Sequence, residues 1–359
     1  MTLDLSPADL LDRLVGFPTV VGTPNGALME FVADYLRAHD VPFTLLKGPE
    51  GDRYNLFATI GDASVPGYIL SGHVDVVPAQ EPEWQADPFV MRRADGRLIG
   101  RGCCDMKGYV AAALAAVPAL QKMNLSAPVH IAMSYDEEAG CRGVPHMLAA
   151  LPDLCAAPLG CIVGEPTGLV PVLAHKGKAA LRLLSEGRAG HSSRPDLGAN
   201  AIHGLLPALL AATTQAKALE TGPQDPRFAP PYSSLQIGTL KGGQAINIIP
   251  EAAQAEIEAR AIAGVDPQTL LAPVLDALGE GVRGEWMSTY PALALDADHP
   301  LAHLVAGISG NAPLGAVSFG TEAGLFQQAG VHRPEEYRTQ DELSGAVDMI
   351  LSLGRTLAT

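Results

Sequence analysis

The sequence is poor in several residue types, and each shortage excludes a class of protein. Only five cysteines are present and no two form a C-x-x-C pair, so neither a disulfide framework nor a structural zinc knuckle is indicated. Lys and Arg total 24 against 39 Asp and Glu, a net charge of −15. This charge repels nucleic-acid phosphates and anionic lipids and attracts metal ions and cationic substrates. We therefore expect no nucleic-acid partner.

Long apolar segments are also absent from the sequence. The longest stretch, residues 109–120, contains Pro118 and falls short of the ~20 residues that a membrane-spanning helix needs. The N-terminus carries an acidic residue where a signal peptide has positive charge, and no small-residue cleavage site follows an apolar run. We therefore expect no membrane association and a location in the reducing cytoplasm.

What the sequence does contain is typical of a two-domain globular protein. Its 359 residues exceed the roughly 250–300 at which a single hydrophobic core stops growing. The hydrophobic fraction of 47% and the charged fraction of 18% lie near globular averages. These values exclude a mainly disordered chain and a coiled coil.

The pattern of apolar residues predicts how the two domains are arranged. Up to residue 174, apolar strands alternate with helices, which is typical of an α/β domain with a mixed, largely parallel sheet covered on both faces. From 175 to 290 the order, allowing one short extra strand, is β-α-β-β-α-β, as in a ferredoxin-like α+β layer, with helices expected at 198–216 and 267–279. The α/β pattern then returns. We predict a discontinuous domain, 1–174 and 291–359, with an inserted domain at 175–290.

Acidic residues and a histidine lie at four strand ends predicted in the first domain. They are His73 and Asp75 in SGHVDVV, Asp105 in GRGCCDMKG, Glu137 and Glu138 in SYDEEAG, and Glu165 in VGEPT. Each has an ordinary explanation by itself, such as a chance H-x-D, a helix cap, a solvated acidic loop or a turn. Because ligands gather at the carboxyl ends of strands in such sheets, their coincidence favours a paired-metal site.

The spacing of His73 and Asp75 and the adjacent pair of glutamates each indicate a role at such a site. Asp75 stands two residues after His73, on the same face of an extended strand, where its carboxylate can orient a metal-bound imidazole. In the Glu137–Glu138 pair, one carboxylate can bind a metal while its neighbour takes a proton from water. Nucleophilic alternatives lack support, because there is no G-x-S-x-G elbow and Cys103 and Cys104 have no recognisable partner base.

Eight motifs together resemble those of the dinuclear-zinc aminoacylase and carboxypeptidase superfamily, the M20-type metallopeptidases. They are SGHVDVVP, GRGCCDMKG, SYDEEAGCRG, VGEPT, AHKGK, GRAGHSS, LKGGQAINIIP and FGTEAGLFQQAG. The resemblance runs from about residue 7 to the C-terminus. It implies a zinc-peptidase-like catalytic domain with an inserted lid domain through which two copies form a homodimer.

The resemblance also implies what the strand-end residues do. It implies two zinc ions, for which cobalt can substitute, held by His73, Asp105, Glu138, Glu165 and His332. His73 and Glu165 would hold one ion, Glu138 and His332 the other, and Asp105 would bridge both. Glu137 would be the general base and acid, and Asp75 would orient His73.

The position of His332 departs from the family pattern. The family has an apolar strand and a Gly-Pro-Gly turn before this histidine, whereas only Val331 separates Gly330 from His332 here. Either the second metal site is altered, or residues of the natural chain are missing from the sequence. In the first case we expect weakened occupancy of the second metal.

In the inserted domain the resemblance indicates three substrate contacts. His191 in GRAGHSS matches a histidine that polarises the scissile carbonyl, often from the partner subunit. Asn247 and Arg260 match residues that hold the substrate carboxylate, which an arginine fork suits geometrically. Without the resemblance, His191 could be a helix cap and Arg260 a solvent-facing strand residue.

The activity that the resemblance implies is removal of the acetyl group from N2-acetyl-L-ornithine, giving acetate and ornithine for arginine biosynthesis. The expected partner is thus a small N-acylated amino acid. Three alternatives stay open. The first is a related deacylase, acting on N-acetyl-citrulline, succinyl-diaminopimelate or other acylated amino acids; the others are a dipeptidase and an inactive family member.

Overall fold

The computed structural model describes residues 5–82, 84–330 and 340–358, which fall into two compact units. Unit 1 comprises residues 1–173, 295–315 and 321–359, and unit 2 comprises residues 174–294 and 316–320. Unit 1 is therefore discontinuous in sequence. Residues 174, 291–294 and 316–320, which were predicted to belong to the first domain, group with unit 2. One contact within this group is the hydrogen bond from the amide of Val317 to the carbonyl of Ala174 at 2.9 Å.

Unit 1 is an α/β layer around a five-stranded sheet with the order β1-β2-β6-β3-β7. Its strands are β1 (Phe43–Lys47), β2 (Tyr54–Ile60), β3 (Tyr68–His73), β6 (Val129–Ser134) and β7 (Gly160–Val163), and a separate hairpin joins β4 (Arg92–Ala94) to β5 (Arg97–Ile99). Strand β3 runs parallel to both β6 and β7, whereas β1, β2 and β6 pair antiparallel. The predicted mixed sheet is confirmed.

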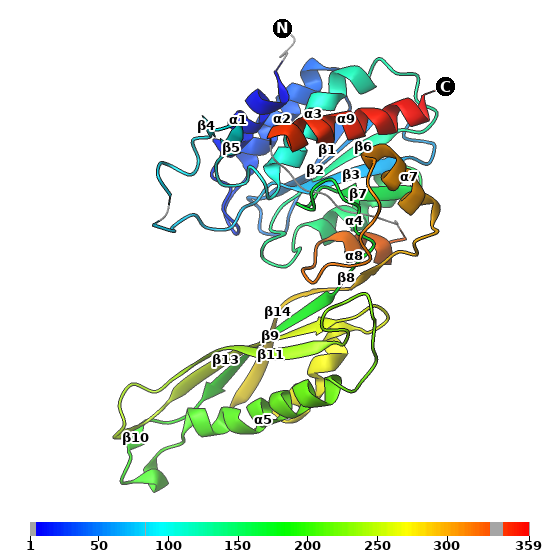
Figure 1. The fold of residues 1–359 in the computed structure, drawn as a ribbon. Coiled ribbons are helices and arrows are strands. Elements are labelled where there is room, and N and C mark those ends of the chain that lie inside the picture. The colour runs from blue at the N-terminus through cyan, green and yellow to red at the C-terminus, as the bar shows by residue number, and fades with distance from the viewer. Residues whose placement is uncertain (1–4, 83, 331–339, 359) are drawn as a thin grey trace. The chain divides into compact units, whose positions relative to one another are not determined.

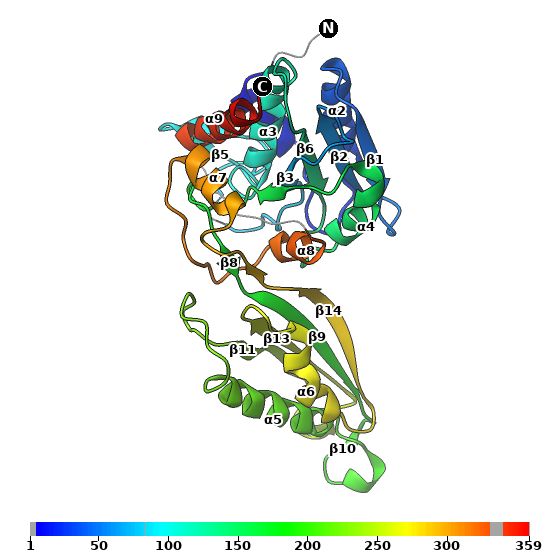
Figure 2. The ribbon, with the colours of Figure 1, turned by 90° about the vertical axis from the view of Figure 1, so that its right-hand side faces the viewer.

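Helices flank this sheet (Figures 1 and 2). They are α1 (Pro7–Val15), α2 (Gly26–Ala38), α3 (Lys107–Leu120), α4 (Val144–Leu154), α7 (Pro300–Ser309), α8 (Ala323–Gln328) and α9 (Gln340–Leu357). Helix α3 packs against β3 and is covered by α1 and α9, so it is buried on almost every side. Helices α2 and α4 contact β2.

The three parallel strands deliver their carboxyl ends to one edge of the sheet. Ser71 pairs with Val163 of β7, and His73 pairs with Ser134 of β6, so the segments that follow the three strands leave the sheet at neighbouring places. Strands β6 and β7 are buried along their whole length. The apolar sequence of these strands thus sets where the polar residues after them emerge.

Unit 2 is a four-stranded antiparallel sheet with the order β11-β13-β9-β14. Its elements are β8 (Ala174–His175), β9 (Gly177–Glu186), β10 (Gly190–His191), η1 (Pro195–Leu197), α5 (Ala201–Leu219), β11 (Ser234–Gly242), β12 (Ile248–Ile249), β13 (Ala252–Ala261), η2 (Pro267–Leu271), α6 (Ala272–Asp276), β14 (Val282–Tyr290) and β15 (Leu293–Ala294). Helices α5 and α6 cover one face, where Leu181, Leu183, Leu205 and Ile257 form part of the core. The order of elements is that of a ferredoxin-like layer.

Two predicted helices of this unit differ from the observed ones. The helix expected at 198–216 begins at Ala201, because the side chain of Asn200 caps it by accepting from the amides of Ile202 and His203. The segment expected as one helix at 267–279 is a 3₁₀ turn followed by the short α6. Pro273 has no backbone N–H to donate into the preceding turn, so the helix restarts there.

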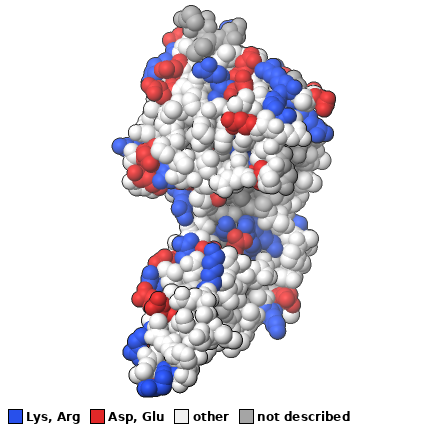
Figure 3. Space-filling model, turned by 90° about the vertical axis from the view of Figure 1, so that its left-hand side faces the viewer, with Lys and Arg blue, Asp and Glu red and all other residues white. Residues whose placement is uncertain are grey.

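On the face shown in Figure 3, acidic and basic side chains are interspersed with uncharged ones. Within residues 5–82, 84–330 and 340–358, no helix combines the length and the apolar character that crossing a membrane requires.

Two glycines offer a matched test of packing in unit 1. A Cβ on Gly164 would lie 1.9 Å from the ring of Tyr109, which is itself buried, whereas a Cβ on Gly307, within α7, would meet no atom within 4 Å. We expect Gly164→Ala to lower the free energy of unfolding by about 1–3 kcal/mol. Gly307→Ala should raise it by roughly 0.5–1 kcal/mol, because alanine is the better helix former. Urea unfolding measures both; equal effects of the two variants would contradict this packing.

Candidate metal centre

His73, the last residue of β3, is positioned by its own strand and by the residue two places on. Only 1% of it is exposed. Its Nδ1 lies 2.9 Å from the backbone carbonyl oxygen of Asp75 and 3.4 Å from Oδ1 of the same residue. The opposite nitrogen, Nε2, lies 3.0 Å from Oδ1 of Asp105 and 3.9 Å from Oε1 of Glu165. The imidazole therefore presents Nε2 to the carboxylates around it.

Asp75 also holds the loop that carries the paired glutamates. Its Oδ1 accepts from the amide of Glu137 and its Oδ2 from the amide of Glu138, both at 3.1 Å. The role expected for Asp75 was to orient His73, and the structure adds this second contact. Asp75 thus contacts the imidazole most closely through its backbone carbonyl and holds the loop through its buried carboxylate.

The donor atoms of five predicted residues converge at this edge of the sheet. His73, Glu137 and Glu165 form one group and His73, Asp105 and Glu138 a second; in each group the ligand atoms lie within 4.8 Å of one another. His73 belongs to both groups. The structure therefore brings together one imidazole and four carboxylates, while the assignment of each to a particular ion stays a prediction.

The electrostatics of the centre fit a cation. Burial raises the pKa of Glu137 to about 8, and the charges of Asp75, Glu322 and Glu138 act in the same direction. Burial and the charge of Asp105 raise the pKa of Glu138 to about 7. Both shifts disfavour the ionised carboxylates, and a divalent metal ion would stabilise them by supplying positive charge. An imidazole with several carboxylates is a donor set that zinc accepts.

The loop between β6 and α4 has a second anchor behind the glutamates. Asp136, in the left-handed region at φ 52°, accepts from the amide of Gly22 at 2.7 Å and forms an ion pair with Arg53. The carbonyl of Glu137 accepts from the amide of Cys141 at 2.8 Å, and the Cys141 thiol lies 3.3 Å from Oε1 of Glu137. These contacts hold the loop in one conformation.

The three residues predicted in the inserted domain do not gather at one place within unit 2. Exposed His191 lies on β10 opposite Ile248, and its Nδ1 is 2.8 Å from Oγ of Ser193. Asn247 lies beside it, accepting from the amide of Ser192 at 3.0 Å. Arg260 is near the C-terminal end of β13. Its guanidinium group donates hydrogen bonds to the carboxylate of Glu258 at 2.7 Å and to the hydroxyl of Tyr290 at 3.1 Å.

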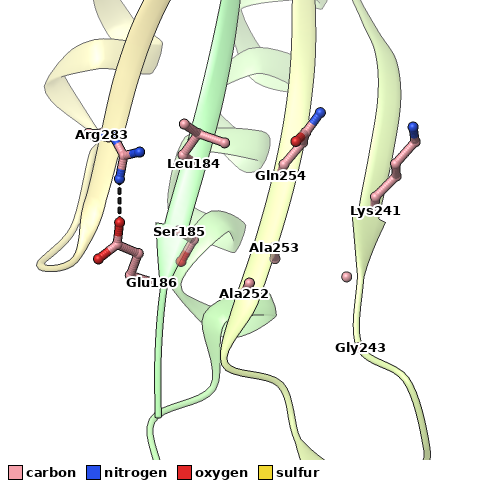
Figure 4. A pocket seen from close by; sticks show the side chains of 10 residues that line it. Leu184, Ser185, Glu186, Lys241, Gly243, Ala252, Ala253, Gln254 and Arg283 are labelled. Atoms are coloured by element: carbon pink, nitrogen blue, oxygen red, sulfur yellow. Dashed lines mark hydrogen bonds and ion pairs between the residues drawn. The ribbon is translucent and has the colours of Figure 1, made fainter. Parts of the chain in front are cut away.

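A shallow pocket of about 380 Å³ lies on the sheet of unit 2 (Figure 4). The ion pair between Arg283 and Glu186 borders it on one side and Lys241 on the other, with Gln254 between them. His191, Asn247 and Arg260 do not line it.

One predicted ligand and one missed residue complete the description of the centre. His332 lies outside the described residues. The sequence analysis assigned no role to Glu322, although it belongs to the motif FGTEAGLFQQAG. Only 1% of Glu322 is exposed, and it accepts hydrogen bonds from Ser71 and Ser134. The only local signal was an acid among small and apolar residues before a helix.

A cluster of carboxylates and an imidazole at the strand ends of an α/β sheet is typical of metal-dependent hydrolases. The model of peptidase family M20/M25/M40 matches residues 69–353. The chain therefore belongs to this family.

Individual relatives agree with that assignment. An acetylornithine deacetylase from Myxococcus xanthus is 33% identical over 347 residues, which cover 89% of this chain and 86% of that protein. Among solved structures, an M20 family metallo-carboxypeptidase from Sulfolobus solfataricus has a TM-score of 0.80 at 17% identity, covering 98% of this chain and 99% of that one. A dinuclear metal binding M20 peptidase from Bacillus subtilis has a TM-score of 0.64 at 14% identity, covering 98% and 97%. These two structures confirm the fold.

Replacing the Asp75 carboxylate by an amide tests whether its hydrogen bonds to the Glu137–Glu138 loop support metal binding. In Asp75→Asn, one backbone amide of the Glu137–Glu138 loop faces an NH₂ group and loses its acceptor. We expect metal affinity to fall roughly 10–100-fold, as is usual when a group supporting the ligands is lost. Competition with a chelator for Zn²⁺ measures this. Asp62→Asn, in an exposed turn with Ser64, is the matched control; a variant at Asp75 that binds zinc as tightly as this control would contradict the role.

Proposed function

We propose that this protein is a zinc-dependent amide hydrolase that removes the acetyl group from N2-acetyl-L-ornithine. The observation that carries the proposal is the convergence of His73, Asp105, Glu137, Glu138 and Glu165. The name of the Myxococcus xanthus relative supports the substrate. The net charge of −15 is compatible with a substrate whose side chain is cationic.

In the proposed site, His73 and Glu165 would hold one ion, Glu138 would contribute to the other, and Asp105 would contribute to both. When bound, the ions supply Lewis acidity toward the acyl carbonyl and lower the pKa of nearby water. Asp75 keeps His73 and the glutamate loop in place through the contacts described above.

Glu137 performs the proton transfers of the proposed reaction. Its carboxylate takes a proton from the attacking water as the new C–O bond forms at the acetyl carbon. It then gives that proton to the amide nitrogen as the C–N bond breaks, which releases acetate and the free amine. No acyl-enzyme forms, and the Cys141 thiol 3.3 Å away helps to hold the Glu137 carboxylate.

The proposed substrate contacts require a second copy of the chain. Arg260 would bind the substrate carboxylate and His191 would polarise the carbonyl, with Asn247 beside it. Within unit 2, β10 lies beyond one end of the sheet (Figures 1 and 2), whereas Arg260 is the second-to-last residue of β13. From Ala252 to Arg260, β13 alone spans roughly 26 Å at about 3.3 Å per residue. A small N-acylated amino acid cannot reach both residues of one copy, so the proposed homodimer supplies His191 from the partner.

Unit 2 has a surface suited to such a dimer. Leu206 and Leu210 lie one turn apart on α5 and are 53% and 68% exposed. Helix α5 packs beside β11, an edge strand whose second half is exposed. An exposed edge strand can pair with its counterpart in another copy while neighbouring apolar side chains are buried.

A panel of substrates tests the proposed activity. With zinc or cobalt supplied, we expect kcat/KM to be highest for N2-acetyl-L-ornithine, followed by N-acetyl-citrulline, which has a similar backbone. Succinyl-diaminopimelate and dipeptides should be poorer. Release of the free amine measures the rate. Faster turnover of dipeptides or of succinyl-diaminopimelate would replace the proposed substrate by that alternative, and no turnover of any would support an inactive member.

The variant Glu137→Gln is the control for the mechanism. It keeps the shape of the side chain and removes the base, so kcat should fall by roughly 10²–10⁴ while zinc binding persists. Unchanged activity of this variant would exclude Glu137 as the base.

Mixing two inactive variants tests the contribution of the partner subunit. His191→Ala keeps the metal centre, and Glu137→Gln keeps the histidine. After dissociation and reassociation, half of the dimers are mixed and each has one complete site, so about a quarter of wild-type activity should return. A mixture of Glu137→Gln with Asp105→Asn, both defective in the metal centre, should stay inactive. Mixed dimers that gain no activity over the separate variants would contradict a contribution in trans.

A further inference from the structure

Glu322 lies beneath the metal centre and joins two strands of the sheet. Its Oε1 accepts from the hydroxyl of Ser71 on β3 and its Oε2 from the hydroxyl of Ser134 on β6, the latter at 2.7 Å. All three side chains are almost completely buried. The two serines are 251 and 188 residues away from Glu322 in sequence.

The two serines are close to the proposed ligands along the chain. Ser71 precedes His73 by two residues, so both point to the same face of β3. Ser134 pairs directly with His73 across the sheet and therefore shares that face. Ser134 is also the last residue of β6 before the loop that carries Glu137. The carboxylate of Glu322 thus spans the place where His73 and the glutamate loop leave the sheet.

Packing alone does not account for a carboxylate at this position. Burying a carboxyl group costs free energy that burying an apolar side chain of similar size does not. Two hydroxyl donors, one for each carboxylate oxygen, offset part of this cost. They also fix the carboxylate to both strands at once, which an apolar side chain cannot do.

We propose that Glu322 is a positioning residue of the metal centre. It ties the carboxyl ends of β3 and β6 together and so holds His73 and the Glu137–Glu138 loop at the spacing that metal binding needs. Glu322 itself touches neither metal nor substrate. The inference rests on the proposed metal function of these residues and adds a residue from α8's N-terminal end to those that support them.

Metal titration of Glu322 variants tests the proposal without any substrate. In Glu322→Ala the tie is lost, so affinity for Co²⁺ should fall roughly 10–100-fold, and the visible spectrum of bound Co²⁺ should change with the ligand geometry. Glu322→Gln should stay within about threefold of wild type, because a serine hydroxyl can rotate to accept from the amide NH₂.

Thr59→Val is the matched control for general loss of stability. Oγ1 of Thr59 on β2 lies 3.0 Å from Nδ1 of His130 on β6, a buried polar contact in the same sheet. This variant should lower the melting temperature of the metal-free protein and leave Co²⁺ affinity and spectrum unchanged. Equal Co²⁺ binding by Glu322→Ala and wild type, or an equal loss in Thr59→Val, would overturn the proposal.

Two serine variants cover the case in which Glu322→Ala does not fold. Ser71→Ala and Ser134→Ala should each weaken Co²⁺ binding, because each removes one of the two hydroxyl groups that fix the Glu322 side chain. Serine variants that bind Co²⁺ like wild type would overturn the inference alone. Wild-type protein that binds no Co²⁺ or Zn²⁺ would overturn the proposed function and this inference with it.

Discussion

Burial of several carboxyl groups close together is the physical constraint on which the metal centre depends. Asp75, Asp136 and Glu322 are each fixed by two donors, which are backbone amides, a guanidinium group or hydroxyls. Burial, together with neighbouring carboxylates, raises the pKa values of Glu137 and Glu138. An external positive charge would therefore stabilise the ionised forms of these two glutamates.

The strands of unit 1 bring the proposed ligands together, and buried polar contacts set the geometry of these ligands. Three parallel strands bring His73, the loop after β6 and the segment after β7 to one edge, and the apolar residues of these strands pack in the core. The polar contacts behind the edge then set the local geometry. Substitution of an apolar strand residue would thus act on stability, whereas substitution of Ser71 or Ser134 would act on the geometry of the ligands.

What the sequence predicts, and what it does not, follows from the range of the interactions involved. His73, Glu137 and Glu165 were recognisable because each follows an apolar strand, which is a local pattern. Glu322 was not, because its partners are far away in sequence. Pro273 was a local signal for the break between η2 and α6 that the prediction overlooked.

The order of the strands in the sheet of unit 2 could not be predicted from the sequence either. The separation of His191 from Arg260 depends on which strands are neighbours and on where β10 and β12 continue beyond the sheet. The grouping of residues 316–320 with unit 2 involves long-range contacts, such as that of Val317 with Ala174. In contrast, the β-α-β-β-α-β pattern of unit 2 is visible from the order of apolar segments alone.

The discontinuity of unit 1 also has a consequence for biosynthesis. Helix α9 packs on α1 and α3, which are synthesised long before it, while nearly all of unit 2 is one continuous stretch. On the ribosome, residues 174–294 of unit 2 have emerged before α9 is made, and α3 keeps an apolar side uncovered until α9 follows. Unit 1 is therefore completed after this stretch of unit 2, and its early helices are the segments that need protection from aggregation in the nascent chain.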